Sequence, residues 1–497
     1  MSAAEPDGIL VLDEGTTSTR ALLLRRGALE EIAAVAQAPL ATAYPEDGWV
    51  EQDAEEIWQR TRDVAREVVR AAGGPGAIAG VGITNQRETT VAWDARDGRA
   101  MAPAIVWQDR RTEDRCQILH EAGHAADVRA RTGLELDPYF SGTKARWILD
   151  ASERARDLSG AGHLRIGTID AWLLWRATGG RSFATDVTNA SRTMLRDLEA
   201  SGDGWSPELC ALLGVPEGAL PRVRPSAADF GETEADFVGA PLPVLSMVGD
   251  QQSALVGHGC LSAGRAMIPS GTGAFLVAHT GETVPRSTHR LLSTVAYGID
   301  GAPRQFALEG SIFNAGTVVQ WMRDDLGILP SAEESARMAS SVPDTGGVVF
   351  VPAFTGLGAP HWRSDARGAL FGITRATRPE HIVRAGLEAL CFQTDELLGA
   401  MARDGAPVHE LRVDGGMARN DWLMQRLADL TGTPVVRPHF TERTALGAAV
   451  LAAIRLGWIT AEEWAAHGPQ ADRFEPALDA GTREVERKRW ADAVARV

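Results

Sequence analysis

Residues 10–24 have the sequence LVLDEGTTSTRALLL, and residues 267–277 have the sequence MIPSGTGAFLV. Each stretch consists of an apolar strand, a turn rich in glycine and threonine, and a second apolar strand, a pattern typical of a β-hairpin. Such a turn exposes backbone N–H groups and hydroxyls with little bulk around them, as phosphate oxygens require. One glycine turn alone is usually only a tight turn. The pair predicts two hairpins that hold one nucleotide between them.

The length of 497 residues exceeds what one hydrophobic core supports, so the sequence predicts two domains. We place them at residues 1–255 and 256–497, because the second hairpin begins near the midpoint. Strand-like and helical runs alternate in both parts, which is typical of the α/β class. The predicted helices cover residues 55–72, 110–130, 379–401, 422–430 and 444–456, and the predicted strands cover residues 78–84, 91–94, 347–351 and 411–414. Small side chains at residues 445 and 447–449 indicate that another element packs closely there.

The composition limits the partners and the compartment. A net charge of −16 is unfavourable for nucleic acid, since binding of a phosphate backbone relies on clustered Lys and Arg. The longest apolar stretch, residues 445–454, is about half the length that crosses a bilayer. The four cysteines are far apart in the sequence and indicate neither a disulfide framework nor a zinc site, and residues 1–8 lack the basic region of a secretion signal. We therefore expect a cytoplasmic protein that does not insert into membranes.

Two aspartates that follow apolar runs are candidates for phosphoryl-transfer chemistry. Asp13 ends the first strand of the first hairpin, where a carboxylate can hold Mg²⁺ through water. Asp250 follows Gly249 and is the candidate general base, which would accept the proton of an alcohol. An Asx turn or a helix cap is the ordinary alternative for a Gly-Asp pair. The only lysines, Lys144 and Lys488, lie outside any Gly-x-x-x-x-Gly-Lys-Ser/Thr loop, which excludes a P-loop nucleotide site.

A cation beside an anion follows the predicted strand at residues 78–84. The segment NQRETT at residues 85–90 places Arg87 next to Glu88 where that strand ends. Glu88 can accept hydrogen bonds from two hydroxyls while Arg87 donates to hydroxyl oxygens, so the pair suits a small polyol. A surface salt bridge is the ordinary alternative for such a pair.

Seven blocks of the sequence together resemble the FGGY family of carbohydrate kinases, and within it the glycerol kinases most. The resemblance extends from about residue 9 to about residue 460. The blocks are DEGTTSTR (13–20), GWVEQ (48–52), NQRET (85–89), IVWQDRRT (105–112), DPYFSGTK (137–144), GDQQ (249–252) and DGG (414–416). Among them, NQRET most separates glycerol kinases from the pentulose kinases of the same family.

The resemblance implies two actin-like (ribonuclease H-like) domains with a nucleotide cleft between them, and transfer of phosphate from ATP to glycerol to give sn-glycerol 3-phosphate. It implies that Asp250 is the general base and that Asp13 and Asp250 flank Mg²⁺. The implied substrate-binding residues are Arg87, Glu88, Trp107, Tyr139, Asp250, Gln251 and Phe275. The implied ATP-binding residues are Thr16, Thr17, Ser18, Arg20, Gly271, Thr272, Gly316, Gln320, Gly416 and Asn420. We expect a homo-oligomer of two or four copies.

Three features depart from the family pattern. Glu14 stands where the family has Gln, which adds a negative charge beside the phosphate turn. Ser270 stands where Tyr commonly precedes Gly-Thr-Gly, which is expected to loosen the pocket near Phe275. The C-terminal tail also diverges, so no site for an effector or a regulatory partner is carried over.

Three alternatives remain at this point. A kinase of the same family that acts on another small polyol or a ketose, such as erythritol or xylulose, would share Asp13 and Asp250. An actin-like ATPase switch would turn over ATP without any polyol. The segment HEAGH at residues 120–124 matches the helical zinc-protease pattern, but Gly123 weakens the helix that this pattern needs.

Overall fold

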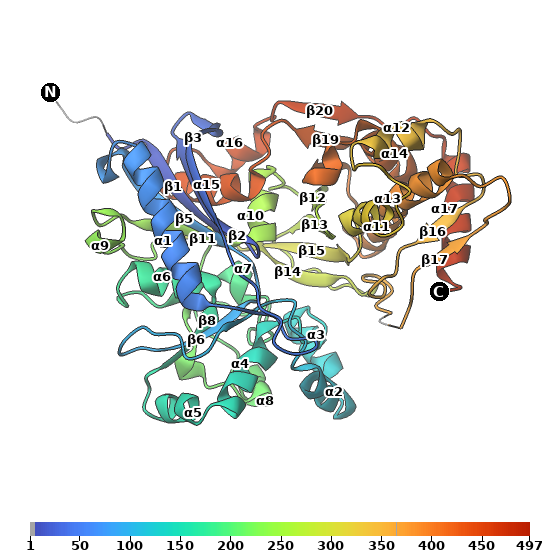
Figure 1. Cartoon of the computed structure of the whole chain (residues 1–497). Coiled ribbons are helices and arrows are strands. Elements are labelled where there is room, and N and C mark those ends of the chain that lie inside the picture. Colours follow the sequence, from blue (N-terminus) through green and yellow to red (C-terminus); the bar gives the residue numbers. More distant parts are fainter. Residues whose placement is uncertain (1–4, 364) are drawn as a thin grey trace.

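The computed structural model describes residues 5–363 and 365–497. In Figure 1 the two halves of the chain lie side by side, each around its own large sheet. The first sheet has five strands in the order β11 (Val244–Gly249), β5 (Ile78–Asn85), β1 (Gly8–Glu14), β2 (Ser18–Arg25) and β3 (Ala28–Pro39). β1, β5 and β11 are parallel to one another, while β2 pairs antiparallel with β1 and β3. The predicted first hairpin is therefore confirmed as β1 and β2.

The second sheet has seven strands and contains the second predicted hairpin. Their order is β14 (Leu292–Tyr297), β15 (Gln305–Ile312), β13 (Ala274–Gly281), β12 (Arg265–Pro269), β18 (Glu410–Asp414), β19 (Val435–Pro438) and β20 (Ala471–Phe474). β12 and β13 pair antiparallel, and β12 also runs parallel to β18. The two hairpins thus occupy matching central positions in the two sheets.

Helices cover both faces of the first sheet. Every residue of β1 is buried, as expected for a parallel strand between two covered faces. Leu10 and Leu12 belong to the core shared with α1 (Ala54–Ala71), whereas Ile9 and Val11 belong to the core shared with α15 (Arg443–Arg455). The alternation places successive side chains of one strand on opposite faces.

The two halves share their central core, because α15 comes late in the chain but packs on β1, β5 and β11 of the first sheet. Next to it lies α10 (Asp250–Gly257). A Cβ atom at Gly257 would overlap the carbonyl of Arg443, and one at Gly447 would overlap the carbonyl of Ser253. Only glycine permits this contact between the two helices. The close packing predicted around residue 447 is confirmed.

The remaining strands form small sheets: β4 (Glu51–Gln52), β7 (Ala104–Ile105), β6 (Thr90–Asp94) and β8 (Leu164–Thr168) in one, β9 (Ala184–Asp186) with β10 (Arg222–Arg224), and β16 (Val349–Val351) with β17 (Ala369–Phe371). The other helices are α2 (Glu113–Glu121), α3 (Ala125–Thr132), α4 (Ser141–Ala151), α5 (Glu153–Gly160), α6 (Ile169–Ala177), α7 (Val187–Ala190), α8 (Pro207–Leu213), α9 (Ala235–Val238), α11 (Gly316–Asp324), α12 (Glu334–Ser340), α13 (Pro379–Arg403), α14 (Asp421–Thr431), α16 (Ala461–Ala466) and α17 (Ala480–Val494). Within the described ranges, no helix has the length and apolar character needed to span a membrane.

Most predicted elements are present within a few residues of the expected bounds, including α1, α13, α14, α15 and the buried strand β5. The single helix predicted at residues 110–130 is wrong. The structure has α2 and α3 instead, separated at Gly123, whose φ of 87° ends the first helix. The strand predicted at 347–351 is shorter and begins at Val349. Part of the prediction for the N-terminus falls on residues 1–4, which lie outside the described residues.

Candidate active site

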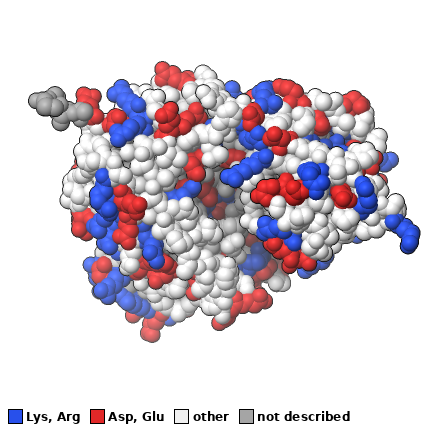
Figure 2. Space-filling model, turned by 45° about the horizontal axis from the view of Figure 1, so that its top comes forward, with Lys and Arg blue, Asp and Glu red and all other residues white. Residues whose placement is uncertain are grey.

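Three parallel strands end side by side at one edge of the first sheet. The register pairs Asp13 of β1 with Thr84 of β5, and Asn85 of β5 with Gly249 of β11. Arg87 follows β5 by two residues, and Asp250 directly follows β11. The predicted magnesium, substrate and base residues therefore meet at the carboxyl ends of neighbouring strands, the usual place for a ligand site in an α/β sheet. In Figure 2 the surface is hollowed between the two halves of the molecule, and charged side chains are visible in this hollow.

Two arginines and two glutamates form a buried network, which we call the ion cluster: Arg87, Glu88, Arg192 and Glu309. Arg87 Nη1 lies 2.6 Å from Glu309 Oε2, and Arg192 Nε lies 2.6 Å from Glu88 Oε1. Arg192 Nη2 also lies 3.0 Å from Glu309 Oε1. The four side chains are at most 2% exposed, so water cannot stabilise their charges and each charge depends on its ion-pair partners. Since Glu309 belongs to β15, the cluster ties the two sheets together.

Arg192 and Glu309 were not predicted from the sequence. Glu309 is the only charged residue of its strand, QFALEGSI, and a lone charge within a buried strand is a detectable signal. Arg192 follows the short helix α7 in a segment without regular periodicity, and no comparable signal marks it. Burial raises the pKa of Glu309, but the guanidinium groups of Arg192 and Arg87 outweigh it and hold the pKa below its usual range.

Asp250 lies at the rim of the ion cluster and is partly open to the cleft. Its side chain is 31% exposed, and its Oδ1 lies 3.3 Å from Arg87 Nε. Burial raises the pKa of Asp250 to about 7, with the Glu88 and Asp13 carboxylates adding to the shift and Arg87 opposing it. A carboxyl group that titrates near neutral pH can accept a proton from a hydroxyl placed against it.

Glu88 has a left-handed backbone conformation, with φ of 60°. Its carbonyl oxygen accepts hydrogen bonds from Thr90 Oγ1 and Ser141 Oγ, both at 3.0 Å. A non-glycine residue in this region is strained, and such strain is concentrated at functional sites. Here it turns the side chain of Glu88 toward Arg192.

Three predicted aromatic residues, Trp107, Tyr139 and Phe275, gather beside the ion cluster and form what we call the aromatic wall. The ring centroids of Trp107 and Tyr139 are 5.6 Å apart, and those of Trp107 and Phe275 are 6.4 Å apart, both in edge-to-face arrangements. Trp107 Nε1 donates a hydrogen bond to Thr16 Oγ1 at 3.0 Å, which connects this wall to the first hairpin turn. Lys144, which the sequence analysis left unassigned, donates from Nζ to the carbonyls of Trp107 and Tyr139 at 3.2 and 3.0 Å.

The remaining predicted substrate residue, Gln251, directly follows Asp250. Its Oε1 is buried and has no hydrogen-bond partner among the described residues. A buried acceptor without a partner is costly, and a ligand hydroxyl would satisfy it. All seven predicted substrate residues thus lie in or around the ion cluster and the aromatic wall.

The first hairpin turn comprises the predicted residues Thr16, Thr17 and Ser18. Gly15 N donates to Ser18 O at 3.0 Å, which closes the turn. Arg20, predicted to bind nucleotide, is already ion-paired with Asp13 and with Glu442 at 2.6 Å. Burial raises the pKa of Asp13, although the charge of Arg20 opposes the shift. Arg20 therefore has its charge balanced within the protein.

Four more predicted residues are brought together by backbone contacts, in segments that we call the glycine turns: residues 270–273, 315–316 and 415–416. Gly316 N donates to Gly271 O at 2.9 Å, and a Cβ atom at Gly316 would lie 2.5 Å from the same oxygen. Gly415, with φ of 87°, packs against Ser270 and leaves Gly416 exposed. The predicted nucleotide residues Gly271, Thr272, Gly316 and Gly416 lie in these segments.

The last two predicted nucleotide residues lie on or beside helices. Gln320 is exposed on α11, the helix that begins at Gly316. Asn420 caps α14, because its Oδ1 accepts from Leu423 N at 3.0 Å, while its Nδ2 donates to Ser335 Oγ at 3.2 Å. A structural role therefore accounts for the visible hydrogen bonds of Asn420.

The two residues that depart from the family pattern, Glu14 and Ser270, are both buried. Glu14 is fully buried and accepts from Gln86 Nε2 at 3.3 Å through one oxygen, while the other has no partner in the described chain. Burial, opposed by the Gln86 hydrogen bond and reinforced by Asp13 and Asp250, raises the pKa of Glu14 well above its usual range. The shift favours the neutral acid, which resembles the Gln amide in shape. Ser270 is also buried and pairs with Asp414 through the backbone.

The carboxyl groups suit Mg²⁺ better than a metal held by many protein ligands. Among the described residues, no group of three His, Cys, Asp or Glu side chains is arranged to hold a metal ion. Mg²⁺ keeps most of its water and takes one or two carboxylates together with phosphates. The Asp13 carboxylate contributes to the raised pKa of Asp250, so a cation near both groups would favour the ionised form of Asp250. The HEAGH segment offers no alternative, because His120 lies in α2 and His124 precedes α3.

Comparisons with known proteins agree with this architecture. Residues 8–257 match the N-terminal domain and residues 266–456 match the C-terminal domain of the FGGY family of carbohydrate kinases. A glycerol kinase of Rhodospirillum centenum is 51% identical over 490 residues, which cover 98% of this chain and 97% of that protein. A glycerol kinase of Xanthobacter autotrophicus is 51% identical over 493 residues, 98% of each chain.

Two solved structures show the same fold over nearly the whole length. The glycerol kinase of Plasmodium falciparum with ADP superposes with a TM-score of 0.93 at 32% identity, covering 100% of this chain and 99% of that one. A ligand-bound xylulose kinase of Lactobacillus acidophilus has a TM-score of 0.87 at 19% identity, covering 98% and 97%, a likeness of fold alone. The predicted α/β fold class is confirmed, and the chain belongs to the FGGY family of carbohydrate kinases.

Proposed function

We propose that this chain transfers the γ-phosphate of ATP to glycerol and releases sn-glycerol 3-phosphate. The observation that carries the proposal is Asp250, a carboxyl group with a pKa raised to about 7 that opens into the cleft beside Arg87. The relatives that are about half identical to the chain over 98% of its length are glycerol kinases, which favours glycerol over other polyols. The limits of the two family matches support a domain boundary near residue 255.

The ion cluster and the aromatic wall divide the recognition of a small polyol. Arg87 would donate hydrogen bonds to hydroxyl oxygens, and Gln251 Oε1 would accept one from a hydroxyl. Glu88 would accept from two hydroxyls. The rings of Trp107 and Phe275 would cover the carbon chain, since aromatic faces suit its C–H groups. The longer carbon chain of a sugar would have to be covered by the same two rings.

Proton transfer falls to Asp250. In the ionised form its carboxylate would accept the proton of the attacking hydroxyl as the new P–O bond forms and the bond to the leaving ADP breaks. Asp13 and Asp250 would hold Mg²⁺, which neutralises charge on the phosphates when bound. The glycine turns and the first hairpin turn would offer backbone N–H groups to the phosphate oxygens. Closure of the two halves would exclude water and limit wasteful hydrolysis of ATP.

ADP release from MgATP by the purified protein tests the proposal. The acceptors compared are glycerol, erythritol, dihydroxyacetone, xylulose and none. We expect the highest kcat/KM with glycerol, with glycerol 3-phosphate as the product. A preference for another acceptor would retain the kinase and reject glycerol. Release that is independent of any acceptor would instead favour an ATPase switch.

A further inference from the structure

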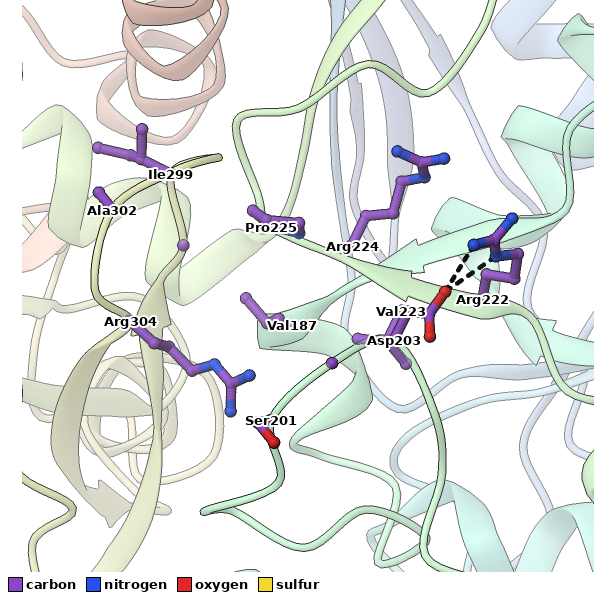
Figure 3. Close-up of a pocket in the computed structure, with 12 residues that line it drawn as sticks. Val187, Ser201, Asp203, Arg222, Val223, Arg224, Pro225, Ile299, Ala302 and Arg304 are labelled. Atoms are coloured by element: carbon purple, nitrogen blue, oxygen red, sulfur yellow. Dashed lines mark hydrogen bonds and ion pairs between the residues drawn. The ribbon is translucent and has the colours of Figure 1, made fainter.

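A second cavity lies outside the cleft, where the two halves of the chain meet, and has a volume of about 460 Å³. One side consists of the first residue of α7, the loop at residues 201–203 and strand β10 with Pro225, and the other consists of the turn between β14 and β15 (Figure 3). None of the predicted active-site residues lines it. The cavity is therefore a separate site built from both halves.

Three arginines line this cavity against one carboxylate. Arg222 is paired with Asp203 at 2.6 Å, which balances that guanidinium. Among the described residues, Arg304 donates one hydrogen bond, to the carbonyl of Leu198 at 3.3 Å, and in Figure 3 it extends toward Ser201. Within the described residues, no hydrogen bond or ion pair engages the guanidinium of Arg224. Arg304 thus has no carboxylate partner in the described part of the chain, whereas the charge of Arg224 acts on Asp203 from beyond ion-pair distance.

A fourth arginine lies behind the loop of the cavity and increases the positive charge there. Arg196 donates to the carbonyls of Gly202 at 2.8 Å and Gly204, and no carboxylate of the described residues lies within ion-pair distance of it. Burial lowers the pKa of Arg196 to about 10, and the charge of Arg304 adds to the shift. Burial also lowers the pKa of Arg304. The carboxylates of Asp203 and Asp197 oppose the shift of the Arg196 pKa but do not cancel it.

The floor of the cavity is apolar. It is formed by the side chains of Val187, Val223, Pro225, Ile299 and Ala302. A guanidinium group can donate two parallel hydrogen bonds to phosphate, and a phosphate monoester carries nearly two negative charges at neutral pH. Arg304 extends toward Ser201 beside this floor (Figure 3), so an organic body attached to the phosphate could lie on the apolar side chains.

Two elements connect the cavity to the ion cluster. Arg304 immediately precedes β15, and Glu309 lies five residues further along this strand, a span of about 17 Å. Val187 begins α7, and Arg192 follows the end of the same helix. A ligand that moves either element therefore moves a member of the ion cluster.

We propose that this cavity binds a small phosphate monoester with an apolar organic body, and that its occupancy changes the affinity of the cleft for glycerol. The second half of this statement rests on the proposed function, whereas the first does not. Because coupling between two binding sites is reciprocal, glycerol in the cleft would change the affinity of the cavity by the same factor.

Calorimetric titration of the purified full-length protein with phenyl phosphate tests the site. Inorganic phosphate and benzoate serve as probes of the two parts of the ligand. We expect saturable binding of one phenyl phosphate per chain, weaker binding of inorganic phosphate, and still weaker binding of benzoate. Arg304→Gln should weaken phenyl phosphate binding at least tenfold, and Arg99→Gln, at an exposed position outside the cavity lining, should not change it.

Absence of heat up to 10 mM phenyl phosphate, or equal affinity in the parent and in Arg304→Gln, would overturn the site. Tighter binding of benzoate than of phenyl phosphate would reject the phosphate specificity. Repeating the titration with glycerol and MgADP present shows whether binding persists when the cleft is filled, as the separate location requires. A loss of all binding under these conditions assigns the ligand to the cleft and overturns the proposal.

Steady-state kinetics with saturating phenyl phosphate test the coupling. We expect the KM for glycerol to change about fivefold in the parent and not in Arg304→Gln. An unchanged KM in the parent would overturn the coupling but leave the site. If the protein turned over no glycerol at all, the proposed function would fail, and the titration alone would still decide the site.

Discussion

The ion cluster and the glycine turns, the predicted substrate and nucleotide sides of the site, are built in opposite ways. The ion cluster consists of charged side chains at most 2% exposed, which hold one another through ion pairs as short as 2.6 Å. The glycine turns consist of backbone held by contacts that leave no room for a side chain at Gly316, and Gly271, Thr272 and Gly416 remain exposed. One side therefore depends on charge balance and the other on backbone shape. Substitutions on each side should produce different kinetic defects.

The largest expected effect is at the rim of the ion cluster. Asp250→Asn removes the proton acceptor but keeps the size of the side chain, so kcat with glycerol should fall about a thousandfold, within the usual range for general bases. Binding of glycerol and of ADP, measured by calorimetry, should remain within a few fold of the parent. Asp229→Asn is the matched control, since Asp229 is exposed and its contact with Gly231 N survives in Asn. Near-parental turnover of Asp250→Asn would show that Asp250 is not the general base.

A second, smaller loss of function is expected at Glu309, together with a loss of stability. Glu309→Gln removes the carboxylate that the buried Arg87 and Arg192 share, and breaking a buried pair costs about 3–5 kcal/mol. The free energy of unfolding should fall accordingly in urea titrations. The KM for glycerol should rise about tenfold, because Arg87 loses the partner that orients it, while kcat changes less.

Glu67→Gln, at an exposed position of α1, controls for the loss of a charge. A Glu309→Gln protein that is as stable as this control would show that the ion cluster does not depend on its charge balance. A parental KM for glycerol would show that Glu309 does not position Arg87.

Asp250 and Glu309 also show how much of the site could be predicted from the sequence. Asp13, Arg87 and Asp250 were predictable, because each stands at or just beyond the end of an apolar strand and such ends meet in a parallel sheet. Glu309 is separated from Arg87 by more than two hundred residues, and only the packing of β15 against the first half brings them together. Local patterns cannot reveal a pairing that the tertiary structure creates.

The glycine turns allow a similar distinction. Their positions were predicted from the Gly-Thr-Gly sequence and the family resemblance, but the contact of Gly316 with Gly271 depends on how α11 begins. The split between α2 and α3 was missed, because the apolar spacing continues across Gly123. The left-handed φ of Gly123, which ends α2, leaves no mark in that spacing. In both places a glycine decided the structure, Gly316 by its close contact with Gly271 and Gly123 by its left-handed φ.

On the glycine side, Gly316→Ala should affect ATP and not glycerol. The added Cβ would lie 2.5 Å from Gly271 O, so the turn must shift and the KM for ATP should rise about five- to tenfold. Gly76→Ala is the matched control, since nothing lies within 4 Å of its Cβ position. A rise in the KM for glycerol of equal size would mean that the two sides of the cleft are not independent.

The smallest effect is expected at Lys144, which supports the aromatic wall from behind. Lys144→Met removes the hydrogen bonds to the carbonyls of Trp107 and Tyr139, so the two segments should loosen and the KM for glycerol should rise about threefold. Lys144→Arg, which retains donors on a longer side chain, should restore part of this loss. An unchanged KM in Lys144→Met would show that the wall is positioned without it.

The same lysine provides a test by pH. Burial lowers the pKa of Lys144 to about 8, with the charges of Glu88 and Asp109 opposing the shift. Between about pH 8 and the pKa of an unfolded lysine near 10.4, the unfolded chain binds the proton and the folded chain does not. The parent should therefore gain stability relative to Lys144→Met as the pH rises from 8 to 10, measured as the difference in thermal midpoint. Lys144→Arg stays charged over this range and should show no such gain. If the difference in thermal midpoint between the parent and Lys144→Met did not change with pH, Lys144 would remain charged in the folded protein from pH 8 to 10.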